Sequence, residues 1–197
     1  MRAFILATAN PHKTEEMAAV LSELGIEVFA RPDHVGEVQE TKDTLEGNAL
    51  LKAHSLAAAT GTVAIADDTG LFVDALGGRP GVHSARYAGE LATYAQNVDK
   101  LLAELAAHED RSAHFRTVIA LVSPEGDELV VHGVLDGVIT REARGENGFG
   151  YDPVFAPNEA LERTLAELSA REKNGLSHRA RALRAMAEVL AAQPRRF

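Results

Sequence analysis

The sequence predicts an α/β protein built on a mixed sheet with flanking helices. Short apolar runs alternate with segments that carry apolar residues at helical spacing, which is typical of strands interleaved with helices. Two longer strand-like segments, residues 115–122 and 128–139, are separated by a Pro-Glu-Gly sequence at 124–126 that favours a hairpin turn. Because a hairpin supplies an antiparallel pair, the sheet is expected to be mixed.

The first element is expected to be a buried strand, because residues 3–7 form a short apolar run. Asn10 and Pro11 then suit the start of a helix, with asparagine as the N-cap and proline at the first helical position. Gly25 is placed to end that helix in a left-handed conformation. The chain is therefore predicted to open with a strand, a polar turn and a helix.

The remaining elements follow from the same reasoning. A second apolar strand, residues 63–66, is expected to end at Asp67 and Asp68, and an apolar run resumes at residues 71–76. No repeat, low-complexity tract or linker divides the chain, so we expect a single domain over residues 1–197. The further helices are predicted at residues 44–59, 94–107, 164–173 and 177–192, and irregular or loop segments at residues 31–42, 77–81 and 145–157.

Composition excludes several classes of protein. The formal net charge of −9 argues against broad nucleic-acid binding, which needs many lysines and arginines. The chain has no cysteine, so disulfides, thiolate metal sites and thiol nucleophiles are excluded. The first residues carry one basic residue and a very short apolar run, which predicts neither a signal peptide nor a membrane span. We expect a cytoplasmic protein that binds neither nucleic acid nor membranes.

The first candidate site lies where the opening strand gives way to the first helix. Free N–H groups at a helix N-terminus and the helix dipole favour an anion there, and Lys13 lies within reach of a phosphate. An ordinary N-cap beside a solvated lysine is the alternative, and this segment alone favours it. The segment is not a Walker loop, because no GxxxxGK[ST] sequence occurs. It comprises Thr8, Ala9, Asn10, Pro11, His12 and Lys13.

Asp67 and Asp68 form the second candidate site. Two adjacent carboxylates after an apolar strand are costly to bury unless positive charge lies beside them. Carboxylate oxygens suit Mg²⁺, which is commonly held by one or two carboxylates together with substrate phosphates. A plain Asp-Thr-Gly turn is the alternative. The apolar run before the pair favours a functional site.

Two further segments have the composition of a ligand site. Residues 148–153 alternate glycines with aromatics in a chain that has few aromatics, so a base could stack there, although a turn that packs its rings into the core is as good an interpretation. Lys173 and Arg179 place cations at the junction of two predicted helices, where they suit a phosphate or a carbonyl acceptor. Solvated charges are the alternative for each of them.

Taken in order, these motifs resemble the inosine/xanthosine triphosphate pyrophosphatase family over nearly the whole chain. The motifs are Thr8-x-Asn10-x-x-Lys13, Ala66-Asp67-Asp68-Thr69-Gly70-Leu71, Leu76-Gly77-Gly78-x-Pro80-Gly81 with Ser84-Ala85-Arg86-Tyr87, Gly148-Phe149-Gly150-Tyr151-Asp152-Pro153, and Glu172-Lys173-Asn174 with Ser177-His178-Arg179. The resemblance implies an elongated mixed sheet with two lobes around a substrate cleft. It also implies a homodimeric, Mg²⁺-dependent enzyme that hydrolyses ITP, dITP and XTP to the monophosphate and pyrophosphate.

The resemblance also implies roles for individual residues. Asp68 matches the general base and a metal ligand, and Glu40 matches a second metal-binding carboxylate. Metal and cationic neighbours are expected to lower the pKa of Asp68, and Arg179 is expected to donate to a 6-oxo purine group. Residues 8–13 and Lys52 match the phosphate contacts. The remaining substrate contacts match Thr69, Phe149, Gly150, Tyr151, Asp152, Lys173, His178 and Arg179.

One segment departs from the family pattern, which is close to F-x-E-N-A-x-x-K-A. Here Leu45 replaces the aromatic residue and Gly47 replaces the glutamate, with Glu46 beside it as a candidate substitute. Asn48 and Lys52 remain four residues apart on one helical face.

Two other functions compete with the pyrophosphatase. A phosphatase of the haloacid-dehalogenase type needs a second Asp two positions after its nucleophile, where this chain has Thr69 after Asp67. A non-catalytic nucleotide-binding module would have no need for Glu40 and Asp68 together.

Overall fold

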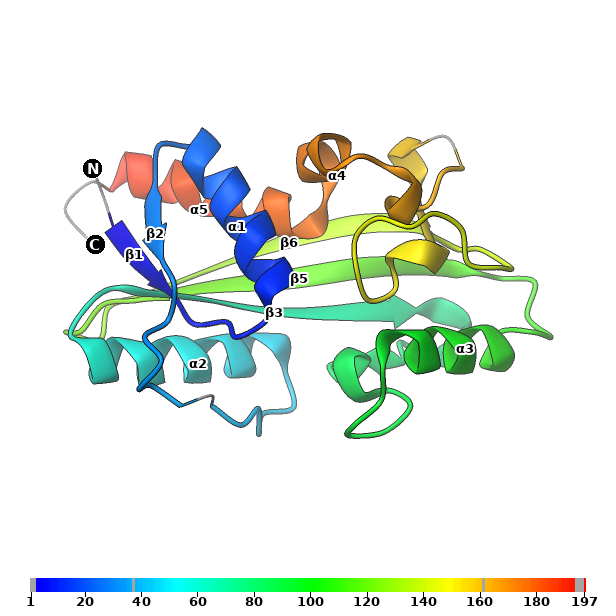
Figure 1. The fold of residues 1–197 in the computed structure, drawn as a ribbon, viewed down its shortest axis with the longest axis horizontal. Helices are drawn as coiled ribbons and strands as arrows, with labels where there is room; N and C mark the ends of the chain where they lie inside the picture. Colours follow the sequence, from blue (N-terminus) through cyan, green and yellow to red (C-terminus); the bar gives the residue numbers. More distant parts are fainter. Residues whose placement is uncertain (1–2, 37, 161, 194–196) are drawn as a thin grey trace. The chain divides into compact units, whose positions relative to one another are not determined.

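The computed structural model describes residues 3–36, 38–160, 162–193 and 197, and the strands among them form one mixed sheet (Figure 1). The strand order is β2-β1-β3-β5-β6-β7, and β4 pairs with β3 outside this path. β1 is parallel to β2 and β3, whereas the β3–β4 and β6–β7 pairs are antiparallel, which confirms the predicted mixed sheet. The strands are β1 Ala3–Leu6, β2 Glu27–Phe29, β3 Ala64–Val73, β4 Pro80–Gly81, β5 Ser112–Val122, β6 Glu128–Ile139 and β7 Phe155–Pro157.

Five α-helices accompany these strands in the part of the chain that the structure describes. They are α1 Pro11–Glu23, α2 Leu45–Thr60, α3 Tyr94–Glu104, α4 Ala170–Leu176 and α5 His178–Ala192. The described chain divides into two compact units. The first unit holds Met1–Asp68, Thr117–Gly133 and Arg179–Phe197, and the second holds Thr69–Arg116 and Val134–His178. The single domain expected from the sequence stays a prediction.

In the first unit, helices cover both faces of the strands: α1 and α5 lie on one side and α2 on the other (Figure 1). One hydrophobic cluster joins Met17 of α1 and Leu183 of α5 to Ile65 and Ile119 of the strands. α1 begins as predicted, because the Asn10 side chain accepts hydrogen bonds from the next turn. α2 is capped by Thr44 and ends at Gly61, which has a left-handed φ of 61°.

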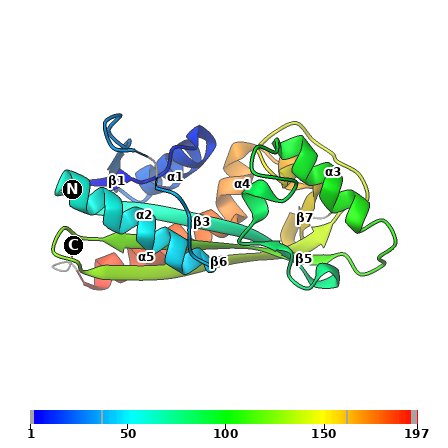
Figure 2. The same ribbon diagram turned by 90° about the horizontal axis from the view of Figure 1, so that it is seen from below.

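In the second unit, α3 packs its apolar face on the strands (Figure 2). Leu101 of α3 belongs to one buried cluster with Leu71, Phe115 and Phe155. Thr93 begins α3 with a capping box, in which Gln96 bonds back to the Thr93 backbone.

Three sequence predictions about the elements are corrected. β3 does not end before Asp67 but runs from Ala64 to Val73, so both carboxylates lie inside the strand. The helix predicted at 164–173 is instead a short 3-10 turn, Leu165–Glu167, followed by α4, because Ser169 makes a new capping box with Glu172. The loop predicted at 145–157 contains β7, and β2 was not predicted.

Candidate active site

The segment 8–13 lies between β1 and α1, as the sequence predicted. The Asn10 carboxamide oxygen accepts from the N–H groups of His12 and Lys13 at 3.0 and 3.4 Å, and Thr8 Oγ1 accepts from the Asn10 N–H at 3.2 Å. Ala9, Pro11 and His12 are exposed, whereas Lys13 reaches back to the strand β3. The turn is therefore held by its own side chains and displays a cation at its end.

Asp67 is the centre of a buried charge network. Its carboxylate lies 3.1 Å from Lys13 Nζ and 3.2 Å from both Nε and Nη2 of Arg179, and Arg179 also pairs with Glu16 of α1. Burial opposes ionisation of Asp67, but Lys13 and Arg179 outweigh it and hold the pKa of Asp67 well below its usual value. Asp67 is therefore a permanent anion that joins β3 to α1 and α5.

Asp68 faces the opposite side of β3, because consecutive residues of a strand alternate. Its carboxylate accepts from Asn48 Nδ2 at 3.3 Å and lies 3.4 Å from Lys52 Nζ, both on α2. The same ammonium lies 2.6 Å from Glu40 Oε1. Asn48 is held in turn by the Lys42 N–H, which donates to its Oδ1 at 2.9 Å.

The pKa values of the two adjacent carboxyl groups, Asp67 and Asp68, shift in opposite directions. Burial raises the pKa of Asp68 to about 6, with Glu40 and Asp67 adding to the rise and Lys52 and Lys13 opposing it. The lowered pKa expected from the sequence concerned Asp68 beside a bound metal ion and stays a prediction, whereas in the protein alone the pKa is raised. The cause is that the strand carries Asp68 into the interior, where desolvation exceeds the attraction of the lysines.

The donor set around Lys52 fits a magnesium ion. Oxygens of Glu40 and Asp68 converge on one ammonium group, so they can also share one divalent cation. Mg²⁺ is commonly held by one or two carboxylates together with substrate phosphates. Gly47 adds no carboxylate, and a side chain there would meet Lys42 Cβ at 2.9 Å, so Lys42 occupies that space. Neighbouring Glu46 is exposed.

The aromatic loop belongs to the second unit and is built around Asp152. The buried Asp152 carboxylate pairs with Lys173 of α4 and accepts from the Phe149 N–H at 2.8 Å. Lys173 Nζ lies 4.9 Å from the centroid of the Phe149 ring. The centroids of the Tyr94 and Phe149 rings are 6.0 Å apart, and the two ring planes meet at 45°. This part of the loop presents an aromatic ring beside a buried cation.

The remaining predicted residues of the second unit are more deeply packed. The Tyr151 hydroxyl donates to the Ser84 carbonyl at 2.9 Å, and burial raises the pKa of Tyr151 well above its usual value. The buried His178 ring stacks on Phe115 at 4.6 Å. Thr69 continues β3 beyond Asp68 and is half-buried, and Gly150 is half-buried in the loop.

The structure thus brings predicted residues together within each unit. In the first unit, Lys13 and Arg179 meet at Asp67, and Glu40 and Asp68 meet at Lys52. In the second, Phe149, Asp152 and Lys173 are in contact. Sequence reasoning placed Asp67 in a candidate site without a role of its own, and it gave no role to Glu16 or Tyr94. The only signal for Glu16 was its spacing of three from Lys13 on one helix. Tyr94 gave none.

Replacing Gly148 with alanine is expected to destabilise the protein by about 2–4 kcal/mol. Gly148 has a φ of +75°, which costs about 1–3 kcal/mol for other residues, and an added Cβ would clash with the Asp152 carboxylate. Asp152 cannot yield without losing its contact with Lys173. Gly150→Ala is the matched control, because its φ is +65° but no atom lies within 4 Å of the added Cβ. Urea unfolding measures both, and equal losses would contradict the clash.

Comparison with known proteins agrees with this fold and these motifs. A HAM1 protein of Coxiella burnetii superimposes with a TM-score of 0.87 at 44% identity, covering 98% of this chain and 100% of that one. Its architecture is a mixed α/β sheet flanked by helices, and this chain shares it. Residues 4–189 match the Ham1 family. The chain belongs to this family, which confirms the resemblance inferred from the motifs.

Two curated relatives are named dITP/XTP pyrophosphatase. The protein of Bacillus anthracis is 47% identical over 196 residues, covering 96% of each chain. That of Streptomyces coelicolor is 48% identical over 197 residues, covering 96% of this chain and 98% of the relative. Among the residues described here, no helix combines the length and the apolar character needed to cross a membrane.

Proposed function

We propose that this protein hydrolyses the non-standard purine nucleoside triphosphates dITP, XTP and ITP to the nucleoside monophosphate and pyrophosphate. The enzyme is a nucleoside-triphosphate pyrophosphatase, the activity for which its relatives are named. The observation that carries the proposal is the convergence of Asp68 and Glu40 on Lys52 in the same unit as the segment 8–13. A binding module would not require the buried Asp68 and the half-buried Glu40 to converge there.

Asp68 is the general base of the proposed reaction. A base works best when its pKa lies near the working pH, and a pKa of about 6 leaves Asp68 mostly ionised at neutral pH yet able to accept a proton. Asn48 and Lys52 bond to its two oxygens and fix the carboxylate. Asp68 takes the proton of the attacking water, and the leaving group is pyrophosphate.

Mg²⁺ would be held by Glu40 and Asp68. When bound, it would supply positive charge that offsets the negative charge of the phosphates. The chain's own cations perform the positioning. Lys13 and Lys52 contact the phosphates, and the exposed turn at residues 8–13 receives them. Positioning of this kind accounts for much of phosphoryl-transfer catalysis.

The aromatic loop of the second unit is the proposed base site. Phe149 offers a ring on which a purine can stack, and Lys173 and the loop residues Gly150, Tyr151 and Asp152 shape its surroundings. Thr69 and His178 belong to the same unit. Recognition of a 6-oxo group by Arg179 stays a prediction, and it requires the guanidinium to exchange contacts with Glu16 or Asp67 for the base.

A product assay tests the proposal. The protein is incubated with Mg²⁺ and each of ITP, dITP, XTP, GTP and ATP, and pyrophosphate is separated from orthophosphate. Pyrophosphate from the first three, with little from ATP or GTP, is the expected result. Adenine leaves a donor that recognises a 6-oxo group unpaired, at a cost of about 1–3 kcal/mol. Guanine has a 6-oxo group, so the exclusion of GTP depends on recognition at position 2 of the purine. Orthophosphate would instead support a phosphatase. Omitting Mg²⁺ should abolish turnover.

Two further properties are proposed from the family resemblance alone. We expect a homodimer and a cytoplasmic location. Sedimentation of the purified protein measures the first, and a single species at the monomer mass of 21.1 kDa would contradict it.

A further inference from the structure

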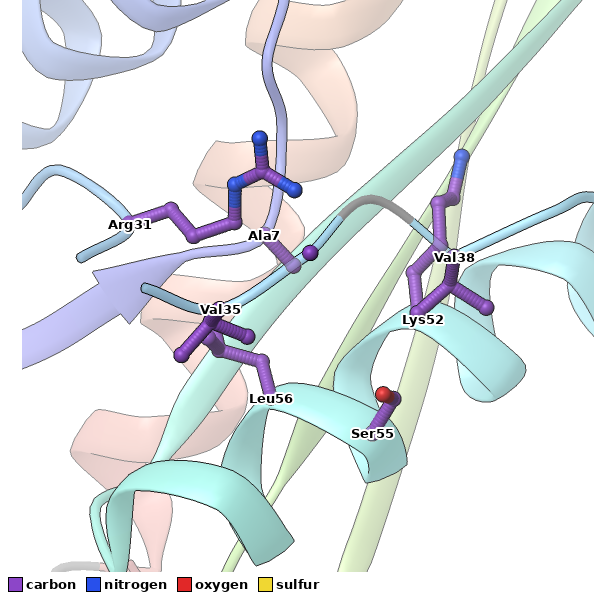
Figure 3. A pocket seen from close by; sticks show the side chains of 8 residues that line it. Ala7, Arg31, Val35, Val38, Lys52, Ser55 and Leu56 are labelled. Atoms are coloured by element: carbon purple, nitrogen blue, oxygen red, sulfur yellow. The ribbon is translucent and has the colours of Figure 1, made fainter. Parts of the chain in front are cut away.

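A small pocket in the first unit lies beside the proposed phosphate site. It opens to solvent, and its apolar lining includes Val35 and Leu56. Arg31 and Lys52 lie on opposite sides of this pocket, with Ala7 between them (Figure 3). Ser55 of α2 adds a hydroxyl to the lining. Two cations therefore face one opening.

The two cations differ in their electrostatic surroundings. Lys52 is already balanced by Glu40 and Asp68. Arg31 is half-buried, and among the residues that the structure describes it makes no ion pair and no hydrogen bond. The protein carries a net charge of −9, so acidic partners are abundant elsewhere. An arginine that lines a pocket and has no carboxylate partner within residues 3–36, 38–160, 162–193 and 197 favours an anionic ligand.

The pocket and the proposed phosphate site share Lys52 and adjacent residues of the chain. Ala7 directly precedes the segment 8–13, and Lys52 reaches both the pocket and Asp68. An anion that touches Lys52 and extends across the pocket meets Arg31 on the opposite side (Figure 3). A chain of phosphates has this extended shape and repeated negative charge.

We propose that Arg31 binds the terminal phosphates of the substrate, and hence the departing pyrophosphate. This inference rests on the proposed function. The planar guanidinium donates two parallel hydrogen bonds to one phosphate group, which a lysine at the same position cannot do. Arg31 touches the phosphates before and after cleavage alike, so it contributes to binding rather than to the chemical step. Arg31 is therefore a substrate-binding residue for the end of the molecule remote from the base.

Pyrophosphate binding to the intact protein, measured by calorimetry, tests the subsite without turnover. We expect Arg31→Gln to weaken pyrophosphate binding by about tenfold to a hundredfold, the loss of a charge-assisted hydrogen-bonded contact. Arg31→Lys should lie between Arg31→Gln and the native protein. Arg171→Gln, which removes the same charge from an exposed position of α4, should bind pyrophosphate as the native protein does. Affinity for the nucleoside monophosphate should be unchanged in all of them.

Two results would overturn the subsite. One is pyrophosphate binding by Arg31→Gln within about twofold of the native affinity, and the other is an equal loss of monophosphate affinity, which would indicate general damage. In turnover, Arg31→Gln should raise KM by the factor seen for pyrophosphate and leave kcat within about twofold. A fall in kcat with unchanged KM would also refute it. If the native protein releases no pyrophosphate from any of the triphosphates, the proposed function fails instead, and that outcome is visible without any variant.

Discussion

Asp68→Asn is expected to lower kcat by about a hundredfold to ten-thousandfold, the range that general-base catalysis contributes. Asparagine has the size of aspartate, so Asn48 and Lys52 keep a partner at this position, and Lys52 also keeps Glu40. What is lost is the only atom in the proposed mechanism that accepts the proton of water. Substrate affinity should fall far less than kcat. Steady-state kinetics with XTP measure both quantities.

The same substitution should leave the protein at least as stable as before. Burial raises the pKa of Asp68, which means that its charged form is costly in the folded state at neutral pH. Removing that charge removes the cost. Asp99→Asn, on an exposed position of α3, is the control for loss of one negative charge. A kcat near that of the native protein would refute the assignment of the base.

Asp67→Ala, unlike Asp68→Asn, is expected to destabilise the fold. The expected loss is about 3–5 kcal/mol, the usual cost of removing one partner of a buried ion pair. Asp67 is 2% exposed, and its removal leaves Lys13 and the 3% exposed Arg179 without their shared carboxylate. Arg179 keeps its ion pair with Glu16. The free energy of unfolding in urea measures the loss.

Asp99→Ala is the matched control, because Asp99 is exposed. It should change the free energy of unfolding by less than about 0.5 kcal/mol. A double variant that also carries Arg179→Met should recover part of the loss, because the uncompensated guanidinium is then removed as well. A loss below about 1 kcal/mol for Asp67→Ala would show that the network contributes little to stability.

Elements with local determinants were predictable from the sequence. The Asn10-Pro11 start of α1 and the Thr44 and Gly61 boundaries of α2 depend on neighbouring residues, so their signals lie within a few positions. The extent of β3 was not predictable in this way. Adjacent carboxylates suggested a strand end, but Arg179, 112 residues further along, neutralises Asp67 and allows the strand to continue. That compensation exists only after folding.

The candidate site also combines features that were predictable from the sequence with features that were not. The family resemblance, which the order of the motifs carries, selected Glu40, Lys52 and Asp68, and the structure places them in contact. The raised pKa of Asp68 could not be anticipated, because it depends on how deeply β3 is covered. The contact of Tyr94 with Phe149 and the pocket at Arg31 join residues that are distant or featureless in the sequence.

The alternation of Asp67 and Asp68 across β3 has a consequence for how this enzyme can change over evolutionary time. Asp67 is tied to α1 and α5, whereas Asp68 is tied to α2 and the segment before it. Substitutions on the α2 side can retune the strength of the base without loosening the ions that hold α1 and α5 to the strand. Selection for a new leaving group or substrate can therefore act on one side of a single strand while the other keeps the protein folded. A lineage that adapts its chemistry should accumulate changes around Lys52 and Asn48 before any around Lys13 and Glu16.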